Sequence, residues 1–450
     1  MSVYNKEYVD AYIGLIRRDP ARYAKDYQDY VQAIARSRAI YMGEPVPGLY
    51  QGIFYDRDTF LSWKRISDTM ISIGEKMTKA YLADPDYRAL FPFSEAMEKL
   101  ILHDPGYDMA VPIARYDLFY EDENRFMFCE CNTDGSSAMN EDNVLGQLMM
   151  ESEGFRDFSA QYDLHNRDYF EPWVEKSLAL YRSIQGENPE TLAIADFKES
   201  GTPYEFLEFQ ERYEKRGIRT FLPDIRELDF RDGALYFGDE KIDMVYRRVT
   251  TSELVEKATE AQGFIDAYYA NAFVCIGSMR SQVIHNKKAF AILHDEDWKH
   301  LFSEEENAFI ENHIPYTGSL NAQTRDHVLE NKDRYIIKPA DSRGSAGVAV
   351  GADWSAEEFA EKIDALLGGP AIYQDYYVAE PMDFVYFDED RNFSVQPLVP
   401  LYGMFIYLGE FEGVYTRVGG ERIISGKTSY FVAPNVEVRA RGESGHTDTE

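Results

Sequence analysis

The segment Val111 to Asn132 constrains the fold of this chain more than any other, because its sequence is typical of two paired β-strands. Two runs rich in β-branched and aromatic residues flank the polar segment Glu121–Asn124, which predicts a β-hairpin. If those four residues form the turn, residues whose numbers sum to about 245 lie opposite each other. This register places Arg115 opposite Glu130.

One face of the predicted hairpin carries candidate ligands for a metal ion. Because side chains alternate along a strand, Arg115 and Asp117 share a face of the first strand. On the second strand, Glu130 and Asn132 share a face by the same alternation. Two carboxylates and an amide oxygen suit a hard cation such as Mg²⁺. A solvated surface hairpin is the alternative that these residues leave open.

Composition limits the classes of partner. The chain has 450 residues, enough for two or three packed units, and 47 basic against 79 acidic residues give a formal charge of −32. Nucleic acid is therefore not an expected partner, whereas cationic partners are allowed. Only Cys129, Cys131 and Cys275 are present, which favours a reducing compartment; the first two are predicted on the hidden face of the hairpin. Without an apolar run of membrane length, we expect a cytoplasmic protein with no membrane partner.

The spacing of apolar residues divides the chain. Residues 1–110 read as mostly helical, with helices over Ala21–Arg36 and Asp58–Leu82. From Thr191 onward, strands alternate with helices, which predicts a small α/β domain with a parallel sheet over residues 191–280. The hairpin region would then occupy residues 111–190, a further unit 281–436, and a flexible tail 437–450.

Two polar loops of the small α/β domain follow strands of the predicted parallel sheet, at the edge where such sheets bind ligands. They are Lys198–Thr202 and Arg247–Ser252. Either loop can hold a substrate. Either can instead be a plain connector that caps a helix at Thr202 or Thr251.

The last third of the chain contains features of a nucleotide site. Lys338 ends a predicted strand and is followed by the Gly/Ser loop Asp341–Gly347, an order suited to a phosphate clamp. A tight hairpin turn is the alternative, and the order of residues is not that of a Walker loop. Lys287 precedes a predicted helix. The strand Ala371–Val378 can present its backbone to an adenine ring.

Taken together in chain order, these motifs resemble the glutathionylspermidine synthase family, a circularly permuted branch of the ATP-grasp ligases. The resemblance rests on Arg115-x-Asp117, Glu130-x-Asn132, Asn286-Lys287, Lys338-Pro339 with its loop, Tyr373-Gln374 and Tyr415-Thr416-Arg417. It implies an α/β (α+β) fold of the circularly permuted ATP-grasp type, with an N-terminal helical region and the small α/β domain as a substrate domain. The metal ligands then come early in the chain and the nucleotide lysines late.

The resemblance also implies roles for individual residues. The Mg²⁺ ligands would be Asp117, Glu130 and Asn132, and the catalytic arginines Arg115 and Arg417. ATP would be bound by Lys287, with Lys288 as the alternative register, and by Lys338, Ser345, Gln374, Asp375, Tyr376 and Tyr377. Candidate substrate residues are Ser136, Ser137, Glu199 and Thr250.

The implied reaction is ATP- and Mg²⁺-dependent formation of an amide from a carboxylate and an amine, by way of an acyl phosphate. The acid would be a small-molecule or peptide-like carboxylate, and a polyamine is one candidate amine. Two alternatives stay open at this point: an ATP-dependent phosphotransferase on the same fold, and a non-catalytic nucleotide-binding protein.

Overall fold

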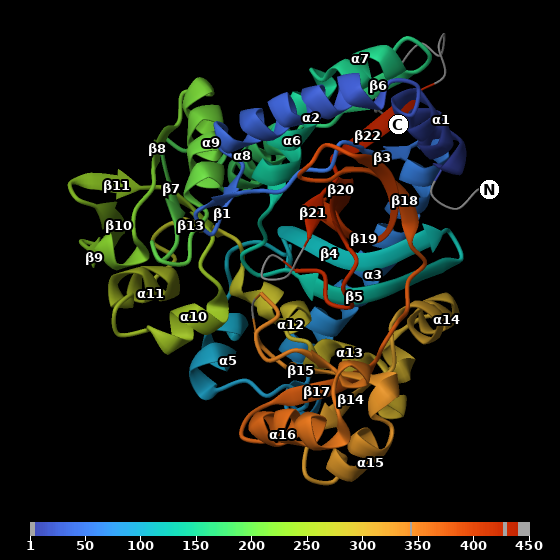
Figure 1. Ribbon diagram of the computed structural model, residues 1–450. Coiled ribbons are helices and arrows are strands. Elements are labelled where there is room, and N and C mark those ends of the chain that lie inside the picture. Colours follow the sequence, from blue (N-terminus) through green and yellow to red (C-terminus); the bar gives the residue numbers. More distant parts are fainter. Residues whose placement is uncertain (1–4, 343, 426–429, 440–450) are drawn as a thin grey trace.

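The computed structural model describes residues 5–342, 344–425 and 430–439. An antiparallel sheet occupies the centre of the molecule, and two smaller α/β units flank it (Figure 1). One unit, green in Figure 1, contains the predicted parallel sheet; the other, orange, contains the strand that ends near Lys338. Within the described residues, no helix is both long and apolar enough to span a membrane.

The central sheet joins the hairpin to strands from the end of the chain. Its strand order is β21-β20-β19-β4-β5, and β18 pairs with the first part of β19. The strands are β4 (Ile113–Asp122), β5 (Arg125–Asn132), β18 (Met382–Phe387), β19 (Phe393–Tyr407), β20 (Glu410–Gly419) and β21 (Phe431–Val432). Arg417 therefore lies inside β20, opposite Leu401 of β19.

The predicted hairpin is confirmed, but its predicted register is wrong by two residues. Arg115 lies opposite Asn132, and Asp117 lies opposite Glu130. The turn is tighter than expected, because β4 continues to Asp122. The Asp122 carboxylate closes the turn by accepting hydrogen bonds from the backbone N–H groups of Asn124 and Arg125. The register also shifts beside Asp117, as expected of a β-bulge.

This bulge separates the two hairpin cysteines, which were predicted on one hidden face. Cys131 is buried in the main hydrophobic core. Cys129 is only partly buried and lies on the wall of the large cavity described below. The simple alternation of a strand does not hold across the extra residue of a bulge.

The N-terminal helices pack around the central sheet and share its core. They are α1 (Lys6–Ile16), α2 (Pro20–Ala35), α3 (Arg57–Ala83), α4 (Pro85–Arg88) and α5 (Glu95–Leu102). The long helix α3 begins where the Asp56 carboxylate accepts the Thr59 N–H at 2.8 Å, and its buried stripe contacts β19 and β20. Both helices predicted in this region are confirmed.

A three-stranded sheet ties the end of the chain to the N-terminal region. Strand β22 (Asn435–Arg439) lies between β3 (Ile53–Tyr55) and β6 (Asp163–Asn166). Residues 437–439 are therefore part of a central strand, which corrects the prediction that the tail begins at residue 437. The rest of the predicted tail, residues 440–450, lies outside the described residues.

The small α/β unit has the parallel sheet that the sequence predicts. Its strand order is β13-β12-β7-β8, all parallel. The strands are β7 (Thr191–Ala195), β8 (Arg219–Phe221), β12 (Met244–Arg247) and β13 (Val274–Ile276); its helices are α9 (Pro203–Lys215), α10 (Thr251–Glu256) and α11 (Gln262–Tyr269). A meander of β9 (Leu228–Arg231), β10 (Ala234–Phe237) and β11 (Glu240–Ile242) lies beside it.

The second unit is an antiparallel sheet with a small core of its own. Its strands are β14 (Thr317–Leu320), β15 (Tyr335–Pro339), β16 (Ala349–Val350) and β17 (Ala371–Asp375), and α13 (Lys288–Leu293), α15 (Arg325–Glu330) and α16 (Ala356–Leu366) accompany them. The remaining elements are β1 (Ile40–Tyr41), β2 (Glu44–Pro45), α6 (Met139–Met150), α7 (Glu153–Phe158), α8 (Phe170–Gln185), α12 (Gln282–His285) and α14 (Glu304–His313).

A buried ion pair fixes the parallel sheet to the loop that leaves the hairpin. Arg247, at the end of β12, donates to Asp134 at 2.5 Å, and both side chains are almost fully buried. Arg247 also donates to the Gly277 and Ser278 carbonyls, and Asp134 accepts the Thr251 N–H at 2.6 Å. The pair therefore holds the carboxyl edge of the parallel sheet against the loop that follows the β4–β5 hairpin.

We predict that Asp134→Ala destabilises the protein by about 3–5 kcal/mol, because it leaves the Arg247 guanidinium buried without its counter-ion. Urea unfolding followed by circular dichroism measures the change. The control is Asp364→Ala, which breaks the exposed pair between Asp364 and Arg325 and is expected to cost less than about 1 kcal/mol. Equal effects of the two substitutions would contradict the structural role given to Asp134.

Candidate active site

One cavity of about 740 Å³ lies where the central sheet, the parallel sheet and the second unit meet. This volume is within the range of small-molecule sites. Every predicted site residue except Asp117 lines it: Arg115, Glu130, Asn132, Ser136, Ser137, Glu199, Thr250, Lys287, Lys338, Ser345, Gln374, Asp375, Tyr376, Tyr377 and Arg417. The fold thus gathers residues that are up to about 300 positions apart in the chain.

The Asp117 carboxylate lies just behind the cavity wall and is fully buried. Arg115 donates to both of its oxygens, at 2.7 and 3.0 Å, and Arg417 donates to Oδ2 at 2.7 Å. A buried carboxylate is stable as an anion when cations pair with it in this way. Asp117 thereby positions both arginines at the cavity wall.

The close approach of Arg115 to the sheet requires a glycine on the neighbouring strand. Gly403 lies opposite Asp117 on β19, and a Cβ atom at this position would lie 2.6 Å from Cδ of Arg115. Any larger residue would push the Arg115 side chain away from Asp117. The sequence gives no separate signal for this requirement.

Glu130 and Asn132 are the predicted metal ligands on the cavity wall itself. The Asn132 amide is 3.3 Å from the Glu130 carboxylate and 3.1 Å from that of Asp117, so the three side chains converge. Burial alone would raise the pKa of Glu130, but Lys287, Lys338 and the two arginines lower it well below its usual value. Glu130 is therefore an anion at any physiological pH.

This donor set fits a hard cation. Carboxylate and amide oxygens are the ligands that Mg²⁺ prefers, and two carboxylates and one amide group converge here, with the Asn132 amide nitrogen donating to both carboxylates. No group of three His, Cys, Asp or Glu side chains with metal-site geometry occurs among the described residues, so a cation here relies on the Asn132 amide as well. Of the three, Glu130 and Asn132 are the ones open to the cavity, because Asp117 is engaged by both arginines.

The two predicted nucleotide lysines meet the hairpin from the second unit. Lys338 is buried and donates to Oε1 of Gln374 at 2.8 Å and to the Cys129 carbonyl at 3.2 Å. Lys287 lies 3.3 Å from the Glu130 carboxylate and donates to the Ser342 carbonyl. Both ammonium groups therefore lie near Glu130, one of the predicted metal ligands, where they can pair with phosphate oxygens.

The structure also separates Lys287 from its neighbour Lys288. Lys287 lines the cavity, whereas Lys288 is bonded to the Ser319 hydroxyl and does not line it. Of the loop after Lys338, Ser345 reaches the cavity with a left-handed φ of 59°. Arg343, in the same predicted phosphate loop, lies outside the described residues.

The predicted adenine contacts form the end of β17 and the segment after it. The backbone N–H of Asp375 donates to the Tyr316 carbonyl and that of Tyr376 to the Arg334 carbonyl, both at 2.9 Å. The Asp375 carboxylate is held by Arg334. These groups are used within the protein, so Asp375 shapes this edge without a free carboxylate to offer a ligand.

Four buried polar atoms of cavity-lining residues have no partner among the described residues. They are Nε of Arg417, Nε of Arg248, Nδ1 of His285 and Oγ of Ser342. Buried polar atoms are normally hydrogen-bonded, and unpaired ones mark a place for a missing partner. Their clustering around one cavity, with the lysines, fits a polar, anionic ligand such as a nucleotide with its phosphates.

Of the predicted substrate residues, Ser136, Ser137 and Thr250 each have a structural role in addition to lining the cavity. Ser136 and Ser137 follow the hairpin; the Ser136 hydroxyl is bonded to the Asn132 carbonyl, and the Ser137 carbonyl accepts from Arg115 at 2.8 Å. Thr250 lines the cavity and is the N-cap of α10, a role predicted for Thr251. Thr202 stands at the N-cap of α9 without a capping hydrogen bond.

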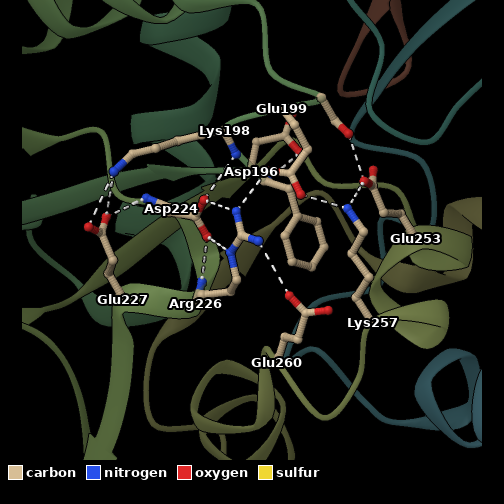
Figure 2. A network of polar contacts seen from close by, with 11 residues as sticks. Asp196, Lys198, Glu199, Asp224, Arg226, Glu227, Glu253, Lys257 and Glu260 are labelled. Carbon is tan, nitrogen blue, oxygen red and sulfur yellow. Dashed lines mark hydrogen bonds and ion pairs between the residues drawn. The ribbon is translucent and has the colours of Figure 1, made fainter.

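Glu199 belongs to a dense polar network at the rim of the parallel sheet (Figure 2). Its carboxylate is bonded to Lys257 at 2.8 Å and to Arg226 at 2.7 Å, and these contacts lower its pKa to about 2. Arg226 in turn is bonded to Asp224, and the ring of Phe197 lies between the two cations. Glu199 is half exposed and already paired, so it is less open to a ligand than the sequence suggests.

Among the cavity residues that were not predicted as site residues, several have side chains that can carry charge and lie deep in the fold. Glu141 is in the first turn of α6, Arg248 follows β12, and His285 ends α12. Arg248 pairs with the buried Glu205 at 2.7 Å, and Glu205 accepts the first N–H groups of α6. Arg248 stands in a polar loop that the sequence did single out; helix patterns around the other two read as ordinary core.

The family of the chain follows from its sequence. The family model described as a circularly permuted ATP-grasp matches residues 94–374, more than half of the chain. The protein belongs to the circularly permuted ATP-grasp family. The predicted fold class is thereby confirmed, and the family implies that ATP is used.

The chain also shares its fold with a solved structure of low sequence identity. A glutathione synthetase-like effector from Globodera pallida, in its apo form, has a TM-score of 0.57 and 12% sequence identity, over 92% of this chain and 97% of that chain. A putative γ-glutamylcysteine synthetase from Methylobacillus flagellatus KT has a TM-score of 0.39 and 10% identity, over 80% and 84% of the two chains. No curated protein sequence matches this chain.

We predict that a non-hydrolysable ATP analogue with Mg²⁺ stabilises the protein, and that Lys287→Met removes most of that effect. At about a hundred times its dissociation constant the analogue should add roughly 2.7 kcal/mol of stability, seen as a higher melting temperature. Lys288→Met is the matched control and should keep the full shift, since that side chain lies off the cavity. Equal shifts in both variants would count against the phosphate-binding role of Lys287.

Proposed function

We propose that this ATP-grasp protein is a ligase that uses ATP and Mg²⁺ to join a carboxylate to an amine through an acyl phosphate. The observation that carries the proposal is the charge arrangement around one cavity. Lys287 and Lys338 stand beside the open pair Glu130 and Asn132, and the two arginines held by Asp117 complete the wall. Phosphoryl transfer depends on such positioning and charge neutralisation.

In this proposal, Glu130 and Asn132 would hold Mg²⁺ at the cavity wall, with the predicted third ligand Asp117 held behind them by the two arginines. The ion would supply charge neutralisation on the phosphates. Lys287 and Lys338 bind phosphate oxygens and fix the nucleotide. Gln374 orients the Lys338 ammonium through its 2.8 Å hydrogen bond, and its own amide donates to Thr317 at 3.0 Å. The lysine is therefore held in place before the nucleotide arrives.

Arg115 and Arg417 face the place where the substrate carboxylate would receive the phosphoryl group. Their guanidinium groups are fixed by Asp117, so they stabilise negative charge without reorganising. Nε of Arg417 has no partner among the described residues and is free to donate to a developing oxyanion. A carboxylate acceptor carries the negative charge that these arginines neutralise, whereas a neutral alcohol does not, and this favours the ligase over the phosphotransferase.

The cavity also extends beyond the arginines toward the parallel sheet, past Ser136, Ser137 and Thr250. We propose that this part holds the remainder of the acid, in keeping with a peptide-like or amino-acid carboxylate. Arg248, whose Nε lacks a partner, gives it a fixed cation that suits a second carboxylate. The chain charge of −32 is compatible with a cationic amine such as a polyamine.

Hydroxylamine tests this function, because it intercepts an acyl phosphate as a hydroxamate. We predict that a panel of amino acids and short peptides contains at least one acid that yields hydroxamate, and that the product requires acid, ATP and Mg²⁺ together. Arg417→Met should lower its formation while the analogue-induced melting shift stays. A phosphorylated alcohol in place of the hydroxamate would establish the phosphotransferase, and no ATP turnover with any acceptor would favour a non-catalytic nucleotide-binding protein.

A further inference from the structure

Glu141 is an acidic side chain of the cavity wall that the proposed mechanism leaves without a task. It lies in the first turn of α6 and is 7% exposed. Its carboxyl group makes no hydrogen bond or ion pair with another residue in the described part of the chain. By contrast, Asp117, Glu130 and Glu199 on or behind the same wall are all paired with arginine or lysine.

Glu141 is not needed to cap its helix. The backbone N–H groups of Ala138, Met139 and Asn140 all donate to one carboxylate oxygen of Glu205, at 2.9 to 3.3 Å. A carboxylate from another helix thus satisfies the first turn of α6. The position of Glu141 at the cavity calls for another explanation.

Tyrosine side chains line the same cavity as this carboxyl group. Tyr415, from β20, and Tyr430 are two of them, and after burial the Glu141 charge is the next largest cause that raises the pKa of each hydroxyl. Tyr41 also lines the cavity and lies near Tyr430. A carboxylate and aromatic rings that line one cavity offer an ammonium group both an opposite charge and π-faces.

The charged groups that face Glu141 come from three other elements. Glu205 of α9 repels its charge, whereas Arg115 of β4 and Arg248, after β12, attract it. Burial has the largest effect and, with the Glu205 charge, outweighs the two arginines, so that the pKa of Glu141 is raised to about 7. A group with such a pKa can take up and release a proton near neutral pH.

We propose that Glu141 and the tyrosine rings beside it form the subsite for the amine substrate, where Glu141 binds its primary ammonium group and removes one proton. This inference rests on the proposed ligase function and adds the place of the nucleophile to it. The Arg115 guanidinium carbon lies 5.8 Å from the centroid of the Tyr415 ring, and in the proposed function this arginine faces the carboxylate that becomes the acyl phosphate. An amine held here would therefore stand next to the acyl phosphate.

The proton balance of the step is complete. The ammonium group gives one proton to the Glu141 carboxylate and becomes a neutral amine. Its lone pair then attacks the acyl carbon, the C–N bond forms, and the C–O bond to the phosphate breaks. The second proton leaves with the phosphate, so no oxidant or further reactant is needed.

Binding can be tested without turnover by saturation-transfer NMR with 1-butylamine, and with 1-butanol as the uncharged probe. The wild type should bind the amine and not the alcohol, and Glu141→Gln should weaken amine binding about tenfold, or 1.4 kcal/mol. Because the acidic surface also attracts amines, Glu151→Gln, an exposed change at the other end of α6, is the matched control and should bind like the wild type. Equal amine binding by all three proteins, or no binding by the wild type, would overturn the inference.

Turnover supplies an independent test that separates this inference from the ligase proposal. With the acid found by hydroxamate formation, Glu141→Gln should keep the rate with hydroxylamine, which is largely neutral at pH 7. With 1-butylamine, whose pKa resembles the lysine value of about 10.4, the rate of Glu141→Gln should be about a hundredfold below that of the wild type. The wild-type rate should decrease below neutral pH as Glu141 is protonated, and the variant should not show this decrease. An equal loss with both nucleophiles, or none with butylamine, would refute the role of Glu141 while hydroxamate formation by the wild type keeps the ligase proposal intact.

Discussion

The arrangement of the cavity depends on one buried carboxylate, that of Asp117. A fully buried anion needs cations within bonding distance, and Arg115 and Arg417 supply them from two different strands of the central sheet. The two guanidinium groups in turn depend on this carboxylate, because it is the anion that holds both of them at the cavity wall. Gly403 completes the constraint, since a side chain there would occupy the space of Arg115.

Circular permutation explains why the residues around Asp117 come from distant parts of the chain. The hairpin provides Glu130 and Asn132 early, the second unit provides Lys287 and Lys338 late, and β20 provides Arg417 near the end. Pairing of β4 with β19 brings the first and last of these together. The Asp134–Arg247 pair then fixes the parallel sheet at the open side of the same cavity, where the substrates are proposed to bind.

Local patterns predicted the elements of this site better than their exact geometry. The hairpin, the parallel sheet and the lysine at the end of β15 follow from alternation, β-branched runs and turn residues, and all are present. The register failed because a tighter turn and a bulge at Cys129 shifted the pairing, and strand alternation cannot foresee a bulge. From the sequence, Glu199 was a candidate substrate residue, but in the structure its carboxylate is paired with Lys257 and Arg226. Glu141 was missed because only the tertiary structure shows that its carboxyl group is buried at the cavity without a paired cation among the residues that the structure describes.

The transfer of labelled oxygen tests the central claim, carboxylate activation by ATP, most directly. With an acid whose carboxylate is labelled with ¹⁸O, amide formation through an acyl phosphate moves one labelled oxygen into the inorganic phosphate for each amide made. Mass spectrometry of the phosphate measures this transfer, and the account predicts a ratio of one to one. Amide or ADP formed with unlabelled phosphate would contradict carboxylate activation, and with it the roles proposed for Arg115 and Arg417.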